Sequence, residues 1–215
     1  SGADSIVGGS ASDTITGAGG ADTLKGGAGN DRLIVEDTDA LIDGGADVDT
    51  AVFAAAVDEA NLADADFINI ERVEITNTTT DAEYDFSNQG TTEGNTENFE
   101  IIGNSQNDTI IGGADTHTVD GAGGNDVFEN LTGDDYIDGG EGTDQLILTA
   151  DYVHEEGVAT ADADSRLESV ENVLVTGDGT FTVDLSYQAG ESFEVTSSTN
   201  DHTITLADGD DTVLG

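Results

Sequence analysis

Large apolar residues recur every nine positions in three parts of the chain, each two residues after an Asp or a His. The Asp or His positions are Asp4, Asp13, Asp22 and Asp31, then Asp108, His117, Asp126, Asp135 and Asp144, and finally His202 and Asp211. The apolar partners are Ile6, Ile15, Leu24 and Leu33, then Ile110, Val119, Phe128, Ile137 and Leu146, and finally Ile204 and Val213. The first series continues to Ile42 and, more weakly, to Ala51 after Asp49. A period of nine residues predicts very short strands joined by tight turns.

Glycine-rich segments precede these aspartates. Residues 26–34 and 139–147 fit G-G-x-G-x-D-x-U-x, where U is a large apolar residue, and residues 8–16, 17–25 and 44–52 are near matches. Glycine suits turns because it adopts positive φ. Two nonapeptides form one turn of a flat coil, and successive turns stack as parallel strands about 4.8 Å apart. The pattern therefore predicts an all-β fold of parallel β-roll or β-solenoid blocks, with an inner apolar row and aspartates along the edges.

Two segments interrupt this period. Residues 53–100 and 149–196 lack the nonapeptide and show alternating, strand-like runs, and residues 70–76 resemble residues 170–176. The predicted organisation is a first roll at 1–52, a spacer or capping β segment at 53–100, a second roll at 101–148, a second spacer at 149–196 and a third roll beginning at 197–215. The spacers should cap or extend the rolls, and residues 56–66 are a candidate short helix or turn. The chain begins without Met and ends within a repeat, so we expect it to be part of a longer protein.

The charge is strongly one-sided, with 47 acidic against 4 basic residues and a formal net charge of −43. This excludes nucleic acid and anionic membranes as partners, and no apolar run is long enough for a membrane helix. The absence of Cys removes disulfides, Cys-bound zinc and thiol chemistry. No nucleophile motif or phosphate loop is found, so we expect no enzyme activity. Self-repulsion opposes compaction, which leaves high external salt or bound cations to stabilise a fold.

The stacked turns favour bound cations. Aspartates 18 residues apart lie on one edge of the coil and repel each other unless a cation lies between them. Ca²⁺ accepts six to eight carboxylate and carbonyl oxygens, whereas Mg²⁺ requires octahedral geometry and retains its water. Calcium is therefore the predicted cofactor, in several sites.

These motifs resemble the RTX (repeats-in-toxin) family of secreted bacterial proteins. The resemblance implies that each calcium lies between same-side turns. One repeat supplies the backbone carbonyls of its second and fourth residues and the carboxylate of its Asp. The repeat 18 residues later supplies the carbonyls of its first and third residues and its own Asp. The implied ligand sets are Gly9, Ala11 and Asp13 with Gly26, Ala28 and Asp31; Gly27, Gly29 and Asp31 with Gly44, Ala46 and Asp49; Gly2 and Asp4 with Gly17, Gly19 and Asp22; Asn104, Gln106 and Asp108 with Gly121, Gly123 and Asp126; and Ala122, Gly124 and Asp126 with Gly139, Glu141 and Asp144.

Three slots depart from the pattern. Ala40 takes an Asp position, so Asp22 lacks a forward partner unless Asp37 or Asp39 replaces it. His117 stands opposite Asp135, a further candidate ligand, and His202 takes another Asp position. We expect these histidines to fill their slots rather than bind zinc, because no Cys or second His lies at ligand spacing.

The resemblance implies a chain that is secreted unfolded through a one-step channel and folds on extracellular calcium. The first functional hypothesis is a structural module of a bacterial surface protein, such as a surface-layer (S-layer) subunit, that binds calcium and other copies of itself or other surface proteins, without membrane insertion. The alternatives are the stalk of a calcium-dependent adhesin, or the carrier region of a secreted RTX enzyme or toxin.

Overall fold

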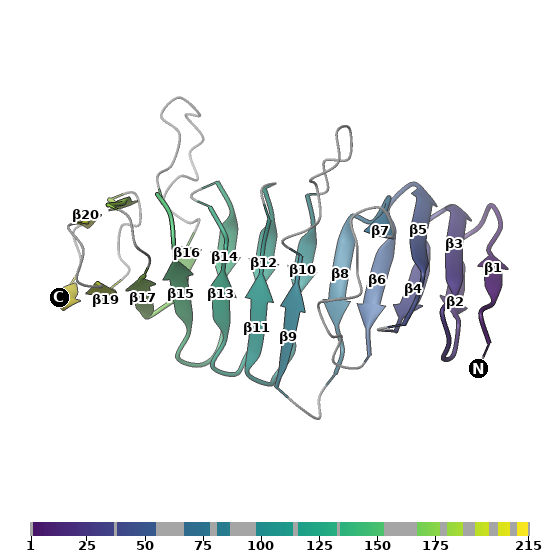
Figure 1. The fold of residues 1–215 in the computed structure, drawn as a ribbon, viewed down its shortest axis with the longest axis horizontal. Coiled ribbons are helices and arrows are strands. Elements are labelled where there is room, and N and C mark those ends of the chain that lie inside the picture. The colour runs from purple at the N-terminus through teal and green to yellow at the C-terminus, as the bar shows by residue number, and fades with distance from the viewer. Residues whose placement is uncertain are drawn as a thin grey trace.

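The computed structural model forms an elongated coil of parallel β-strands, with the two termini at opposite ends (Figure 1). It describes residues 2–36, 38–54, 67–77, 81–86, 98–113, 116–132, 134–152, 167–176, 180–186, 192–197, 202–206 and 210–214. These residues contain strands and turns and no helix. The predicted all-β solenoid is confirmed.

One long sheet runs along the coil and contains eight strands in the order β16-β14-β12-β10-β8-β6-β4-β2. These strands are β2 (Thr14–Thr16), β4 (Arg32–Val35), β6 (Thr50–Phe53), β8 (Arg72–Ile75), β10 (Glu100–Ile102), β12 (Thr118–Asp120), β14 (Tyr136–Asp138) and β16 (Leu167–Glu168). The strand order shows that the chain returns to this sheet once in every turn of the coil.

The odd-numbered strands form two further sheets, of four and seven strands. The first contains β1 (Ser5–Val7), β3 (Thr23–Ala28), β5 (Leu41–Ala46) and β7 (Phe67–Ile68). The second contains β9 (Ala82–Asp85), β11 (Asp108–Ile111), β13 (Val127–Glu129), β15 (Gln145–Leu148), β17 (Asn172–Val175), β19 (Glu194–Ser197) and β21 (Thr212–Leu214). A separate parallel pair is formed by β18 (Thr182–Leu185) and β20 (Thr203–Leu206).

The register within the repeats follows the nine-residue phase. Ile6 pairs with Leu24, and Leu24 pairs with Ile42, so equivalent residues stack from coil to coil. Their side chains point inward, and Leu24 and Ile42 are fully buried. Burial of such a side chain contributes about 1.5–3 kcal/mol, so this row is the main apolar support of each roll.

The spacer strands join the same sheets. Strand β8 pairs with β6 on one side and β10 on the other, and β17 lies between β15 and β19. The described parts of both spacers therefore extend the solenoid. Larger side chains fill this part of the core, where Phe53 packs edge-on against Tyr84 and Phe86. The boundaries of the five segments stay a prediction, and the candidate helix or turn at 56–66 lies outside the described residues.

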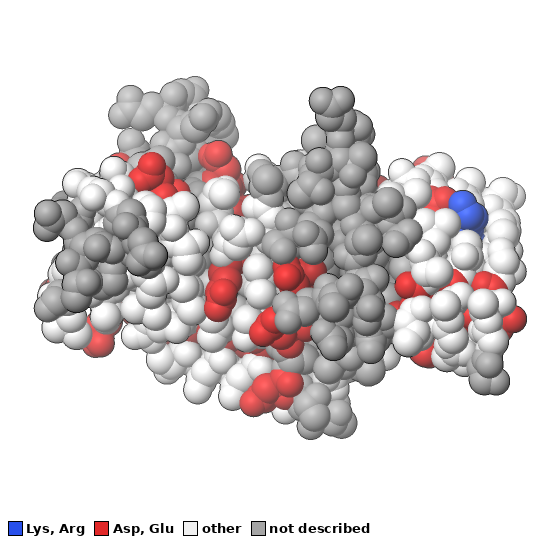
Figure 2. Space-filling view, viewed as in Figure 1, with Lys and Arg blue, Asp and Glu red and all other residues white. Residues whose placement is uncertain are grey.

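Acidic side chains lie along the length of the coil on the face shown in Figure 2, whereas the one basic patch visible there lies near the N-terminal end. Lys25 pairs with Asp43 at 3.0 Å, and Arg32 pairs with Glu74 at 2.6 Å. Exposed ion pairs of this kind contribute about 0–1 kcal/mol. They cannot offset the repulsion of a chain with a net charge of −43.

Candidate calcium sites

The glycine-rich turns stack closely because their backbones lie against one another. Gly27 has a φ of 116°, and a Cβ there would collide with the carbonyl oxygen of Gly9 in the preceding coil. Only glycine meets both requirements. Each turn thus brings peptide oxygens of one coil next to the following coil.

The aspartates form ladders along the edges of the coil. The Asp31 N–H donates to Asp49 Oδ1 at 2.7 Å, and the Asp126 N–H donates to Asp144 Oδ1 at 2.7 Å. The same bond joins three further pairs, Asp4 to Asp22, Asp13 to Asp31, and Asp108 to Asp126, at 2.7–2.8 Å. In each pair, Oδ1 of the aspartate that comes later in the sequence therefore accepts a hydrogen bond from the backbone of the preceding coil.

The second carboxylate oxygen, Oδ2, has no hydrogen-bond partner in several of these aspartates. Oδ2 is buried and accepts no hydrogen bond in Asp22, Asp31, Asp49, Asp126 and Asp144. These residues are 0–2% exposed. A buried charged oxygen without a partner is costly unless a cation or a proton neutralises it. The recurrence of this feature along both blocks points to a repeated cation site.

Peptide oxygens converge with these carboxylates. A Cβ on Gly26 would collide with Asp31 Oδ2 and with the carbonyl oxygen of Gly44 in the next coil. The same pairing, a carboxylate oxygen and the first carbonyl of the repeat 18 residues later, recurs beside two other glycines: Asp13 Oδ2 with Gly26 O beside Gly8, and Asp126 Oδ2 with Gly139 O beside Gly121. Carboxylate and carbonyl oxygens are the ligands that calcium prefers. The donor set therefore fits calcium.

The electrostatics agree with this chemistry. Burial, together with the nearby charges of Asp144 and Asp108, raises the pKa of Asp126 to about 7, although a hydrogen bond from the Asp108 backbone lowers it in part. Burial, together with the charge of Glu171, raises the pKa of Asp144 to about 6. Burial likewise raises the pKa of Asp49. A raised pKa means that the carboxyl binds protons more readily than usual, so bound calcium would compete with protons at Asp126 and Asp144.

The predicted ligand residues all lie in the described turns or at the adjoining strand ends. Some of the predicted carbonyls already accept backbone hydrogen bonds in this structure. The carbonyl oxygens of Gly9, Asn104 and Ala122 accept from the N–H groups of Ala28, Gly123 and Glu141. Each carbonyl has a second lone pair, so these bonds leave it able to bind a cation.

Asp135 has a different environment. Its Oδ1 accepts from the His117 N–H at 2.6 Å, and its Oδ2 accepts from the Thr132 N–H. A Cβ on Gly112 would collide with the side chain of Leu131 and would lie 3.2 Å from the carbonyl oxygen of Asn130, so an apolar group lies beside the carbonyl in this turn. Both carboxylate oxygens of Asp135 thus already accept hydrogen bonds. Asp135 stays a predicted ligand and is not part of the five ligand sets proposed below.

The histidines continue the ladder by another means. His117 is buried, its Nδ1 accepts from the Phe99 N–H at 3.3 Å, and its ring stacks on that of Phe99. His202 likewise accepts from the Phe181 N–H at 3.2 Å and stacks on Phe181. Each imidazole nitrogen therefore takes the hydrogen-bonding role that an Asp Oδ1 has elsewhere.

The gap at Ala40 brings Asp39 beside Asp22. Asp39 is buried, its Oδ2 accepts from the Glu36 N–H at 2.9 Å, and its Oδ1 has no hydrogen-bond partner. Burial raises the pKa of Asp39, and the charge of Asp22 raises it further. Asp39 thus supplies the second carboxylate that the sequence required there, whereas Asp37 lies outside the described residues.

Sequence reasoning missed two acidic residues of the ladder. Asp49 donates its N–H to Glu71 Oε2 at 2.8 Å, and Asp144 donates to Glu171 Oε2 at 2.7 Å. Both glutamates lie in the spacers, outside the nonapeptide phase. The available signal was the resemblance of residues 70–76 to 170–176, which aligns these two glutamates.

Side chains alone do not form a metal centre in the described ranges, where no three His, Cys, Asp or Glu side chains come together. A cation in these turns would take pairs of carboxylates and complete its shell with backbone carbonyls. No helix of the described residues could cross a membrane.

The fold and its edges define a parallel β-solenoid with repeated oxygen cradles between turns. Residues 1–33, 100–128 and 131–151 match the family model of the RTX calcium-binding nonapeptide repeat, with 4 copies. The chain therefore carries RTX calcium-binding nonapeptide repeats in these segments. Searches of curated proteins and of solved structures find no match.

Proposed function

We propose that the five ligand sets named in the sequence analysis bind calcium and that calcium binding drives folding of the coil. The observation that carries this proposal is the row of buried Oδ2 atoms without hydrogen-bond partners, each on an Asp of a ladder. Ions that bind only the folded chain stabilise it by mass action. The carboxylate and carbonyl oxygens of two neighbouring coils coordinate the calcium ion, whose positive charge neutralises the carboxylates.

The residues of the chain have separate tasks in this process. The glycines allow the turns to stack, the ladder bonds set the spacing of the aspartates, and the inner apolar row holds the strands together. Repulsion between aspartates such as Asp31 and Asp49 opposes this stacking until they are neutralised. Folding and ion binding therefore become one equilibrium.

We propose further that this module belongs to a secreted bacterial protein of the cell surface. RTX repeats typically occur in secreted proteins. Calcium sites of extracellular modules have dissociation constants of roughly 10⁻⁴–10⁻³ M, so such a chain stays open where calcium is scarce and folds outside. The proposed role is structural, as in a surface layer, with further copies of the chain or other surface proteins as partners. Support comes from the rod-like solenoid and from the repetition of roll and spacer (Figure 1).

Calcium-dependent self-assembly of the chain distinguishes the structural role from an adhesin stalk or a carrier region. The purified chain is mixed with calcium and followed by light scattering and negative-stain electron microscopy. Calcium-dependent ordered sheets or filaments support the structural role. A folded monomer that remains dispersed contradicts self-assembly and favours an adhesin stalk or a carrier region.

A further inference from the structure

The last turn of each of the first two nonapeptide blocks lies next to the first strands of the spacer that follows, and the two spacers pair with it in equivalent register. Ile42 and Asp43 pair with Phe67 and Ile68, and Thr50 pairs with Arg72. Continuing this register places Asn69 opposite Gly44 and Glu71 opposite Asp49. The second block repeats it, since the pairings of β14 with β16 and of β15 with β17 place Ser169 opposite Gly139 and Glu171 opposite Asp144.

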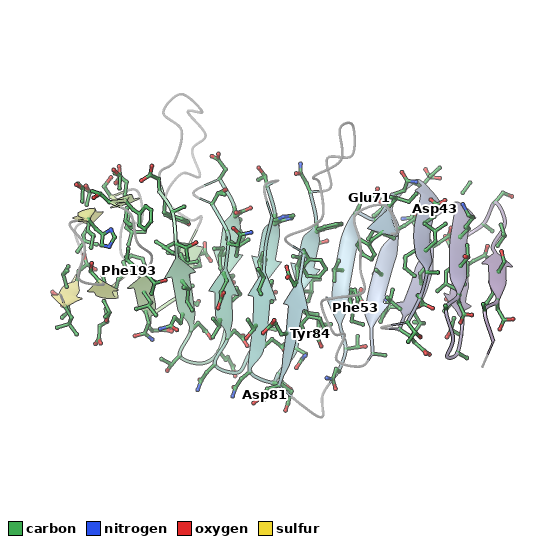
Figure 3. The ribbon with its side chains drawn as sticks, in the orientation of Figure 1. Asp43, Phe53, Glu71, Asp81, Tyr84 and Phe193 are labelled. Carbon is green, nitrogen blue, oxygen red and sulfur yellow. The ribbon has the colours of Figure 1, made fainter. Side chains whose placement is uncertain are left out.

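The spacer glutamates make the same bond as the ladder aspartates. Glu71 Oε2 accepts from the Asp49 N–H at 2.8 Å, which matches the 2.7 Å bond between Asp31 and Asp49 one coil earlier. Glu171 accepts from Asp144 at 2.7 Å. Figure 3 shows Glu71 at the edge of the coil beside β8. The ladder of Asp13, Asp31 and Asp49 therefore ends on Glu71, and that of Asp108, Asp126 and Asp144 ends on Glu171; glutamate is one methylene longer than aspartate.

A cradle of oxygens stands beside each glutamate. A Cβ on Gly44 would lie 2.7 Å from Asp49 Oδ2 and would collide with the carbonyl oxygen of Asn69. Asp49 is fully buried, and its Oδ2 has no hydrogen-bond partner.

The second boundary has the same arrangement. A Cβ on Gly139 would lie 2.7 Å from Asp144 Oδ2 and would collide with the carbonyl oxygen of Ser169. Asp144 is also fully buried, and its Oδ2 is likewise without a partner.

The backbone that presents these carbonyls is unusual. Asn69 and Ser169 have φ values of 53° and 52°, in the left-handed region that L-residues other than Asn and Asp seldom adopt. The same conformation recurs although 22 residues separate Asp49 from Glu71 and 27 separate Asp144 from Glu171. Asn tolerates this conformation, whereas Ser169 is strained in it, and strained backbone is retained where the surrounding structure requires it.

We propose that Glu71 and Glu171 each complete an additional calcium site, in which Asp49 with the Asn69 carbonyl, and Asp144 with the Ser169 carbonyl, supply further oxygens. These sites do not follow the nonapeptide and lie at the junction of roll and spacer. Each ion would join the last turn of a roll to the first turn of a spacer, so that the order of β8 and β17 depends on calcium. This inference rests on the proposed calcium binding of the repeats.

The test counts bound calcium in the full chain. Glu71→Gln, Glu171→Gln and the double variant keep an oxygen that can accept the ladder bond and remove the charge. Glu83→Gln, at an exposed position of β9, is the matched control. Native mass spectrometry and equilibrium dialysis in saturating calcium give the number of ions, and far-UV circular dichroism verifies folding. We expect one ion fewer in each single variant, two fewer in the double variant and no change in the control.

The outcomes separate this inference from the one on which it rests. If the wild type binds calcium and the double variant binds as much, the glutamates serve only as hydrogen-bond acceptors and the inference is overturned. If the wild type binds no calcium, the proposed function itself fails. If the variants do not fold, a crystal structure of the calcium-loaded wild type decides, because an ion bound to Asp49 and Glu71 supports the inference and its absence refutes it.

Discussion

Asp31 and Asp49 stand one above the other, with the Asp31 N–H bonded to Asp49 Oδ1 at 2.7 Å and Asp31 Oδ2 buried without a hydrogen-bond partner. Asp22, Asp31, Asp49, Asp126 and Asp144 thus each use one oxygen to fix the spacing of the coils and leave the other for a cation. Stability and calcium binding therefore depend on the same side chains.

Asp31→Asn should lower the number of bound calcium ions by two, because Asp31 belongs to two of the proposed ligand sets. Each lost site removes about 2.7 kcal/mol of stabilisation when free calcium is 100 times the dissociation constant. Urea unfolding at fixed calcium, together with calcium counting, measures both effects. Glu83→Gln, at an exposed position of β9, is the control and should change neither. An Asn variant as stable as the wild type in calcium, with all ions retained, would contradict the ligand sets.

The calcium-free coil should lose stability as pH rises from about 4 to 8. Burial raises the pKa of Asp126 to about 7 and that of Asp144 to about 6, above the value of about 3.9 in an unfolded chain. The folded chain therefore holds more protons, so this contribution is complete below about pH 4 and is lost as pH passes through 6 and 7. Urea unfolding in EDTA at several pH values measures it.

Calcium affinity should show the opposite trend and rise from pH 5 to 8, because the ion replaces those protons. Titration calorimetry in buffers of different ionisation enthalpy detects the released protons. The interpretation fails if affinity is the same at pH 5 and pH 8, or if the calcium-free coil becomes more stable with rising pH.

His117→Ala should destabilise the chain without changing its calcium count. The substitution removes the stack on Phe99 and the acceptor of the buried Phe99 N–H, and an unsatisfied buried N–H costs about 1–3 kcal/mol. Unfolding in calcium, together with an ion count, separates the two effects. Loss of an ion in this variant would show that the turn of His117 is a metal site after all.

Leu33→Ala should cost about 2–5 kcal/mol, as is usual for a buried Leu. Leu33 is fully buried and stacks between Ile15 and Ala51 of the neighbouring coils. Val7→Ala is a suitable control, since Val7 is 65% exposed and surface changes stay within about 0.5 kcal/mol. Equal effects of the two substitutions would mean that the apolar row does not support the roll.

The rolls could be predicted from the sequence because one period fixes strand, turn and register together. The spacing of Ile6, Leu24 and Ile42 is itself the register, and the aspartates two residues before Ile6 and Leu24 mark the edge. The pairing of Thr50 with Arg72 could not be predicted, because no period crosses the first spacer. The role of Glu71 depends on that pairing. The packing of Leu131 beside Gly112 was equally hidden, since it depends on side-chain volume in a folded turn.

The central claim is that calcium holds the coils together, and far-UV circular dichroism during a calcium titration tests it most directly. Magnesium and high sodium chloride are the controls, and EDTA tests reversal. We expect calcium alone to convert a disordered spectrum into a β spectrum, with EDTA restoring the first. A β spectrum that persists in EDTA at neutral pH, or that sodium chloride produces equally well, would contradict calcium-coupled folding.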